Sequence, residues 1–147
     1  MRYEQGNARE LRDKFWIALA DSPFVMLQLD SDPDSAAPMT ASLDKDANHA
    51  IWFFTSRDNR FAALGPATAT YTARDHDLFA RFHGVLAEET DRERLDKQWS
   101  NFVEAWFPGG KDDPNLLFMR MGLSTASIWS GELGMLATAR MAQTMAG

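Results

Sequence analysis

Two stretches in the middle of the chain alternate apolar or small residues with polar ones, and a short polar turn separates them. They are ATATYTAR (67–74) and LFARFHGVLAEE (78–89), with DHD between them. A period of two residues is typical of a strand with one buried face, and two such runs joined by a turn predict a β-hairpin. An antiparallel sheet is therefore the framework into which the rest of the chain must fit.

Further strands are expected on both sides of this hairpin. Residues 24–30 (FVMLQLD) are expected to form a strand, followed by a loop at 31–38 that is rich in Asp, Ser, Ala and Pro. Residues 39–43 and 50–55 predict a second hairpin around the turn-forming sequence DKDAN. The last strands are expected at 116–121 and 125–129.

Three helical segments are expected at the periphery. The first spans about 8–21 and begins after Asn7, with Glu10 three residues later as in a capping box. A short second helix is expected at 58–64. Apolar residues then recur at helical spacing between 90 and 108, which predicts one continuous amphipathic helix.

Short strands in hairpin order with helices between them favour a small antiparallel barrel over a doubly wound sheet. The length of 147 residues is close to that of one domain. Residues 1–147 are therefore expected to form a single domain, mainly β with peripheral helices. The Ala- and Met-rich tail from about 131 is expected to be helical or frayed.

Composition excludes several classes of function. The chain has no cysteine, which excludes disulfides and thiolate chemistry, and a net charge of −6, which argues against binding to nucleic acid. The longest apolar run, at 15–20, is too short to span a membrane, and the N-terminus has no secretory pattern. A cytoplasmic location is expected by default.

Two segments could bind a ligand. The loop of IWFFTSRDNR (51–60) offers hydroxyl, guanidinium and helix N-terminal N–H groups to a phosphate. The alternative is that Ser56 or Asp58 only caps the helix and that both arginines face solvent. The aromatic corner WFPGG (106–110) could cover a planar ligand or simply close the end of the barrel. Both alternatives remain open on the residues alone.

A catalytic site or a metal site built from protein groups is not expected. The three histidines have no metal-binding spacing, and the serines have no nucleophile context. Any chemistry would therefore be carried by a bound cofactor, with the protein supplying binding and orientation.

The order of several motifs resembles a known family over most of the chain, from about Asn7 to Trp129. The motifs are PMT (38–40), WFFTSRDNR (52–60), the pair Gly65 and Pro66, Gly84 at the end of a strand, WFPGGKDDP (106–114) and IWSGE (128–132). They resemble the general stress proteins related to pyridoxamine 5′-phosphate oxidase, which have the FMN-binding split β-barrel fold. WFPGGKDDP is the most specific of these motifs.

The resemblance implies a flavin site shared between the subunits of a homodimer. It places the flavin ring against the backbone around Met39 and Thr40, with Phe54 and Thr55 along its side. It assigns to Arg60 the contact with the FMN phosphate. The implied cofactor-binding residues are Pro38, Met39, Thr40, Phe54, Thr55, Ser56, Asn59, Arg60 and Trp106. The expected cofactor is FMN, with FAD or another flavin as the alternative.

Two departures from the family pattern limit what is expected. Ala37 stands where relatives commonly carry arginine, and the chain lacks the C-terminal segment by which the true oxidases hold pyridoxamine phosphate. The expected function is therefore a flavin-dependent oxidoreductase of unknown substrate and not a pyridoxamine phosphate oxidase. A non-catalytic flavin-binding or sensing protein is the first alternative, and a split barrel that binds haem or a deazaflavin is the second.

Overall fold

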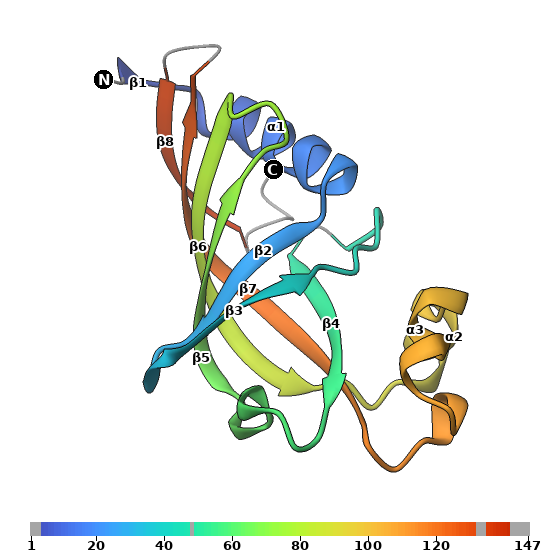
Figure 1. Cartoon of the computed structure of the whole chain (residues 1–147). Helices are drawn as coiled ribbons and strands as arrows, with labels where there is room; N and C mark the ends of the chain where they lie inside the picture. The colour runs from blue at the N-terminus through green and yellow to red at the C-terminus, as the bar shows by residue number, and fades with distance from the viewer. Residues whose placement is uncertain (1–3, 48, 132–134, 142–147) are drawn as a thin grey trace.

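The computed structural model describes residues 4–47, 49–131 and 135–141. A curled, largely antiparallel sheet forms the body of the molecule, with one helix across one end and two short helices at one side (Figure 1). The strands are β1 (Glu4–Gln5), β2 (Phe24–Leu29), β3 (Asp32–Thr40), β4 (Ala50–Ser56), β5 (Gly65–Thr72), β6 (Leu78–Glu88), β7 (Leu116–Ser130) and β8 (Met135–Arg140). The helices are α1 (Ala8–Asp21), α2 (Arg92–Gln98) and α3 (Asn101–Trp106), and the short 3₁₀ turns are η1 (Arg60–Ala63) and η2 (Gly110–Asp112).

The strand order explains why the sheet is open on one side. The strands follow one another as β1-β8-β7-β6-β5-β2-β3, and β4 pairs separately with β7. Among the described residues β3 and β4 do not pair in the sheet, and the bridge between Ser42 and Trp52 lies beyond the end of β3. The barrel is therefore split between β3 and β4.

Helix α1 confirms the expected helix at 8–21 and fills the end of the barrel. Its N-cap is Asn7, whose side-chain oxygen accepts a hydrogen bond from the N–H of Glu10 at 3.0 Å. The buried stripe of Leu11, Phe15 and Leu19 faces the sheet, because residues at this spacing share one helix face. Phe15 meets the ring of Phe82 edge-on at 5.4 Å, so α1 and β6 share one core.

The hairpin predicted at 67–74 and 78–89 is confirmed as β5 and β6, which pair from Gly65 with Leu86 to Thr72 with Phe79. The two predicted strands at 116–121 and 125–129 are in fact one continuous strand, β7. The first part of β7 pairs with β4 and its last part with β8, while β6 lies along most of its length.

The prediction of a loop at 31–38 is wrong, because most of these residues belong to β3. Strand β3 pairs with β2 from Asp32 opposite Leu29 to Thr40 opposite Phe24. The buried hydroxyl of Ser35 accepts a hydrogen bond from the N–H of Leu29 at 2.8 Å, so a turn-forming residue is satisfied inside the sheet. The hairpin predicted for 39–43 and 50–55 is reduced to the antiparallel bridge between Ser42 and Trp52, because β4 pairs with β7 along its length.

The continuous helix predicted between 90 and 108 is broken into α2 and α3. Trp99 takes an extended conformation, with φ −68° and ψ 138°, and Ser100 caps α3 by accepting a hydrogen bond from the N–H of Val103 at 3.3 Å. Helix α2 begins after Asp91, whose side chain accepts a hydrogen bond from the N–H of Glu93 at 3.0 Å. The cause of the break lies at Ser100. Its hydroxyl caps α3 from an extended backbone conformation, and an extended residue at this position cannot continue α2.

The tail is not helical where the structure describes it. Residues 135–140 form β8, which pairs with β7 from Ser130 opposite Met135 to Thr125 opposite Arg140. Residues 132–134 and 142–147, which the tail prediction also covers, lie outside the described residues. Pairing with the long edge of β7 outweighs the helical preference of Ala and Met in this segment.

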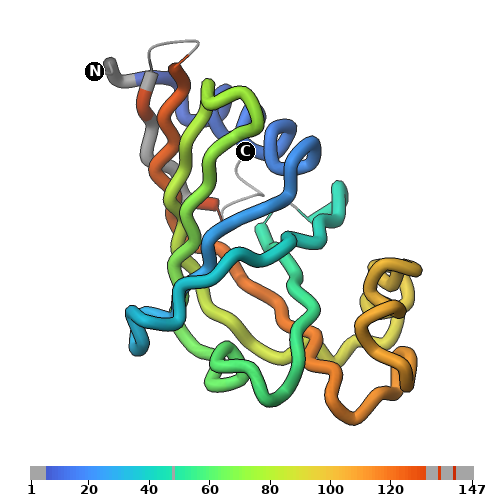
Figure 2. Tube along the Cα trace, in the orientation of Figure 1, coloured from blue at the N-terminus to red at the C-terminus, as the bar shows by residue number. Residues whose placement is uncertain are grey.

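A second, smaller core attaches α2 and α3 to β4 and the start of β7. Figure 2 shows the two helices set to one side of the sheet, next to these strands. The buried residues of this core are Ala47, Ala50, Trp52, Leu95, Val103, Phe107, Leu116 and Phe118. No helix among the described residues is long and apolar enough to cross a membrane.

Candidate functional site: a cleft between β3, β4 and the helix pair

A cleft of about 740 Å³ opens where the barrel is split. Its walls are the ends of β3 and β4 together with the α2–α3 pair, so segments far apart in the sequence meet there. The lining residues are Pro38, Met39, Thr40, Ala41, Ser42, Phe54, Thr55, Ser56, Gln98, Ser100, Phe102, Val103, Trp106, Phe107 and Asn115. A volume of this size falls in the range of small-molecule sites, roughly 300–1,000 Å³.

The β3 wall presents backbone groups to the cleft. On one side, the N–H of Ala41 donates to the carbonyl of Pro23 at 2.7 Å, and on the other side Ser42 bridges to Trp52. Because N–H and C=O groups of successive residues face opposite edges of a strand, those of Thr40 face the split. Thr40 therefore offers a donor and an acceptor at the edge of the cleft.

The β4 wall is aromatic and rigid. The ring of Phe54 stacks on that of Phe118, with centroids 4.5 Å apart, and meets Trp99 edge-on at 6.0 Å. The neighbouring Thr55 is buried, and Ser56 hydrogen-bonds to the carboxylate of Asp58. These contacts fix the ring orientation of Phe54, which is a requirement for stacking a planar ligand.

The helical wall is anchored by a carboxylate beneath it. The side chain of Asp44 is only 3% exposed and accepts hydrogen bonds from Lys97 Nζ at 2.8 Å and from Arg94. The guanidinium of Arg94 also lies over the ring of Trp52, 4.3 Å from its centroid. The hydrogen bond from Lys97, followed by that from the N–H of Asp46, holds the pKa of Asp44 at about 2, although burial opposes this.

The cleft brings together seven of the nine residues that the sequence resemblance implies. They are Pro38, Met39, Thr40, Phe54, Thr55, Ser56 and Trp106. Asn59 and Arg60 do not line the cleft. Asn59 caps η1 by accepting a hydrogen bond from the N–H of Phe61 at 2.9 Å, so the cap of this loop is neither Ser56 nor Asp58.

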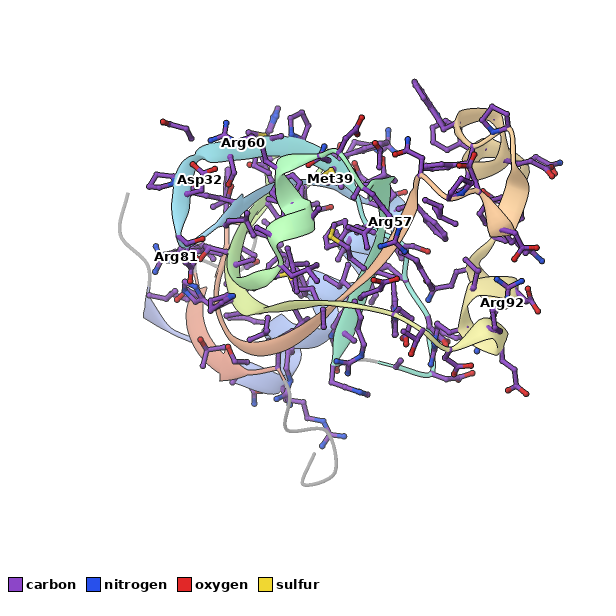
Figure 3. All side chains as sticks on the ribbon, turned by 90° about the horizontal axis from the view of Figure 1, so that it is seen from below. Asp32, Met39, Arg57, Arg60, Arg81 and Arg92 are labelled. Carbon is purple, nitrogen blue, oxygen red and sulfur yellow. The ribbon has the colours of Figure 1, made fainter. Side chains whose placement is uncertain are left out.

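Arg60 is held by an ion pair on the β2–β3 side of the cleft. Its Nε and Nη2 atoms donate to the carboxylate of Asp32 at 3.0 and 2.6 Å, and its Nη1 donates to the carbonyl of Asp34 at 2.8 Å. Figure 3 shows Arg60 beside Asp32, with Met39 further along the same side of the molecule. Both partners of this pair are well exposed, so the pair is accessible to a competing anion.

The other arginine of the loop, Arg57, pairs with Glu88 on β6. Its Nη2 atom lies 2.7 Å from Glu88 Oε2, and the hydrogen bond raises the pKa of Arg57 and lowers the pKa of Glu88. This pair lines a separate hollow and not the cleft. Arg57 therefore connects β4 to β6 across the start of β7.

Sequence reasoning missed Gln98, the last residue of α2. It lines the cleft, and both of its amide atoms, Nε2 and Oε1, are buried without a hydrogen-bond partner. Buried polar atoms are nearly always paired, so an unpaired amide beside a cleft is notable. A single glutamine among charged helix residues carries no sequence signal that could have identified it.

The lining of the cleft is uncharged, since none of its fifteen residues is an acid, lysine, arginine or histidine. Hydroxyl and amide groups alternate there with Met, Phe and Trp side chains. Such a surface suits a neutral, planar, polar-edged ring, whereas a phosphate would need a cation outside the lining. Within the described residues there is also no cluster of three or more His, Asp or Glu side chains that could hold a metal ion.

Comparison with known proteins agrees with this geometry. A family model described as pyridoxamine 5′-phosphate oxidase like matches residues 10–146. The chain is 42% identical to the general stress FMN/FAD binding protein from the phytopathogen Xanthomonas citri, with a TM-score of 0.78, and the match covers 84% of this chain and 91% of that one. No curated protein matches the chain significantly.

Two further solved structures are similar. A protein from Xanthomonas campestris described as a general stress family member is 40% identical, with a TM-score of 0.72, and the match covers 83% of this chain and 89% of that one. A heme binding protein from Mycobacterium smegmatis is 16% identical, with a TM-score of 0.64 over 93% of this chain and 59% of that one, and shows the fold alone. The expected fold class, a mainly β split barrel with peripheral helices, is confirmed.

Proposed function

The chain belongs to the pyridoxamine 5′-phosphate oxidase-like family, and on that premise we propose that it is a general-stress-type protein that binds a flavin, FMN in the first place, in the cleft. The observation that carries the proposal is the cleft itself, whose uncharged lining contains Met39, Thr40 and Phe54. These are the residues that the family resemblance assigns to the flavin ring. The 42% identity to an FMN/FAD binding protein supports the same ligand class.

The residues of the cleft fit the ring part of a flavin. Phe54 is held by Phe118 and Trp99, and Trp106 stands on the opposite, helical wall. Two aromatic walls exclude water from a planar ring, and the backbone N–H of Thr40 can donate to a ring nitrogen or carbonyl. The ring is therefore proposed to lie between β3, β4 and α3.

The phosphate is proposed to lie outside the uncharged cleft, where Arg60 can reach it. Its present pair with Asp32 is exposed on both sides, and such pairs contribute roughly 0–1 kcal/mol. A phosphate dianion with a charge-assisted contact can compete for the same guanidinium. On flavin binding, Arg60 would therefore exchange the carboxylate of Asp32 for the phosphate without a change in the core.

A bound flavin supplies exchange of hydride or electrons, and the protein supplies binding and orientation. We propose a flavin-dependent oxidoreductase of unknown substrate. The uncharged lining offers no general acid or base from this chain, which also suits a protein that stores or senses the flavin without turnover. Turnover of NAD(P)H with an electron acceptor separates these two functions, because only the oxidoreductase consumes NAD(P)H.

The direct test is a titration of flavin-free protein with FMN, followed by flavin fluorescence. Saturable binding at one site per chain is expected. Failure to bind FMN, FAD and riboflavin would contradict the proposal, and binding of haem in their place would favour the haem alternative.

Trp106→Ala is expected to weaken flavin binding about two- to tenfold, because one aromatic ring contact contributes roughly 0.5 to 1.5 kcal/mol. Trp106 is 70% exposed, so its loss should leave the free energy of unfolding nearly unchanged. The matched control is Ile17→Ala on α1, since Ile17 is 71% exposed and lies outside the cleft. If the two variants bind the flavin with equal affinity in a fluorescence titration, Trp106 does not contact the flavin.

A homodimer is proposed, because the outer face of the curled sheet exposes large apolar side chains. Phe24, Met26, Phe79 and Val85 alternate with buried residues along β2 and β6 and therefore share this face. Apolar patches of this kind mark association surfaces in soluble proteins. Light scattering at micromolar concentration should give twice the chain mass of 16.5 kDa.

Phe79→Glu should shift the protein toward the monomer, because it buries a charge in the proposed interface. Ile17→Glu, at a more exposed apolar residue on α1 (71% against 36% for Phe79), should leave the dimer intact. A parent protein with the mass of one chain at micromolar concentration would rule out the dimer.

A further inference from the structure

The side-chain amide of Gln98 faces the protein interior, whereas the amide of a surface glutamine usually faces water. The residue as a whole is half-buried, yet both polar atoms of its amide are inside and have no partner. Glutamine in a helix normally directs its amide to water, since burial without a hydrogen bond carries an energetic cost. This amide therefore gains free energy from any rotation that brings it to a suitable partner.

The position of Gln98 is fixed even though its amide is unpaired. It follows Lys97, and Lys97 and Arg94 both bind the buried carboxylate of Asp44. Trp99, which follows, packs edge-on against Phe54. The contacts of Lys97 and Trp99 thus hold the backbone of Gln98 beside the cleft, while its side chain has no hydrogen bond that fixes the amide.

We propose that Gln98 recognises the imide edge of the flavin ring, by turning its amide into the cleft when the ring binds. This inference rests on the proposed flavin binding and adds a specificity-determining residue to it. An amide carries a donor and an acceptor in one plane, and the imide edge of a flavin carries the complementary N3–H and carbonyl groups. Two parallel hydrogen bonds follow, from N3–H to Oε1 and from Nε2 to a ring carbonyl.

The uncharged lining makes such recognition necessary. Hydrophobic walls accept any flat ring of the right size, so discrimination must come from the polar groups in the lining. The other polar groups of the helical wall and its neighbourhood, the hydroxyl of Ser100 and the amide of Asn115, are engaged: Ser100 Oγ accepts from the N–H of Val103, and Asn115 Nδ2 donates to Ser56 Oγ. Among the described residues that line the cleft, Gln98 is the one whose side-chain donor and acceptor are both buried and without a partner.

The experiment compares FMN with 3-methyl-FMN, which lacks the N3–H donor, on flavin-free parent protein and on Gln98→Met. The parent is expected to bind 3-methyl-FMN at least tenfold more weakly than FMN. Gln98→Met keeps the shape of the side chain without hydrogen bonds, and it should bind FMN about ten- to a hundredfold more weakly than the parent. The variant should no longer discriminate between the two ligands, as expected for a pair of groups that interact directly.

A second readout does not involve the flavin. The urea midpoint of flavin-free Gln98→Met should be equal to or higher than that of the parent, because the substitution removes two unpaired buried atoms. A structural role for the amide would lower it. Gln28→Met on β2, outside the cleft, is the matched control and should leave the affinity for FMN unchanged.

Two results would overturn the inference while leaving flavin binding in place. The first is equal affinity of the parent for FMN and 3-methyl-FMN, a measurement that needs no variant. The second is undiminished discrimination in Gln98→Met. A parent protein that binds neither ligand would overturn the proposed function and this inference together.

Discussion

Arg60→Ala is expected to weaken FMN binding by about ten- to more than a hundredfold, while riboflavin binding changes far less. A charge-assisted hydrogen bond contributes roughly 1.5 to 3 kcal/mol, and each 1.4 kcal/mol is tenfold in affinity. Riboflavin lacks the phosphate, so the difference between the two ligands isolates this contact. Folding should be nearly unaffected, because the Arg60 side chain is 55% exposed.

The companion variant is Asp32→Asn, which removes the present partner of Arg60. If the phosphate and Asp32 compete for one guanidinium, FMN binding should tighten a few fold in Asp32→Asn and riboflavin binding should not change. Fluorescence titrations of both ligands with both variants test this. Equal loss of FMN and riboflavin in Arg60→Ala, or no loss at all, would assign Arg60 to the support of β3 alone.

Asp44→Ala is expected to lower the free energy of unfolding by about 2 to 3 kcal/mol at pH 7. The substitution leaves Arg94 and Lys97 without their buried partner and frees the N–H of Asp46. Breaking a fully buried ion pair costs roughly 3 to 5 kcal/mol, and the expected value is lower because Lys97 can reach water. The loss should also weaken flavin binding, since these contacts hold α2 against the cleft.

The effect of Asp44 should depend on pH in a defined direction. Its pKa in the folded protein is about 2, below the ordinary value of 3.8, so its ionised form stabilises the fold. This contribution is complete above about pH 4 and is lost as the pH falls toward 2. Urea titrations should therefore show a difference between parent and Asp44→Ala that is smaller at pH 3 than at pH 7.

The control is Asp46→Asn, an exposed carboxylate 3.8 Å from Lys97. It should change the free energy of unfolding by less than about 1 kcal/mol, as is usual for exposed pairs. A similar loss in both variants would indicate that the cluster acts only through its overall charge.

Much of the fold could be predicted because its signals are local. The alternation of β5 and β6 and the cap of α1 at Asn7 depend on neighbours within a few residues, and both were predicted correctly. The sequence pattern failed where a distant partner decides. Strand β3 contains residues typical of a turn and is a strand only because β2 pairs with it, and β8 is a strand because β7 offers its edge.

The break between α2 and α3 had a local signal that the apolar periodicity outweighed. Ser100 lies three residues before Val103, as a cap should, but Leu95, Phe102 and Val103 continue the helical spacing across it. A serine inside a long apolar period is thus a possible helix start as well as a surface position.

The residues of the candidate site also differ in whether a local sequence signal could predict them. The family motifs identified the residues of β3 and β4 that line the cleft, since these motifs are contiguous in sequence. They could not indicate that Arg60 pairs with Asp32, or that the amide of Gln98 is unpaired, because both facts depend on packing between distant segments.

The pairing of β4 has a consequence for how the protein is made. Among the described strands, β4 pairs only with β7, which follows much later in the chain. A ribosome adding roughly 5–20 residues per second leaves the apolar strand Ile51–Phe54 without its partner for several seconds. Hydrophobic strands with open edges are prone to join other chains during such a delay. The nascent chain should therefore need protection by a chaperone until Gly122, the last β7 residue that pairs with β4, has left the ribosome and the cleft can form.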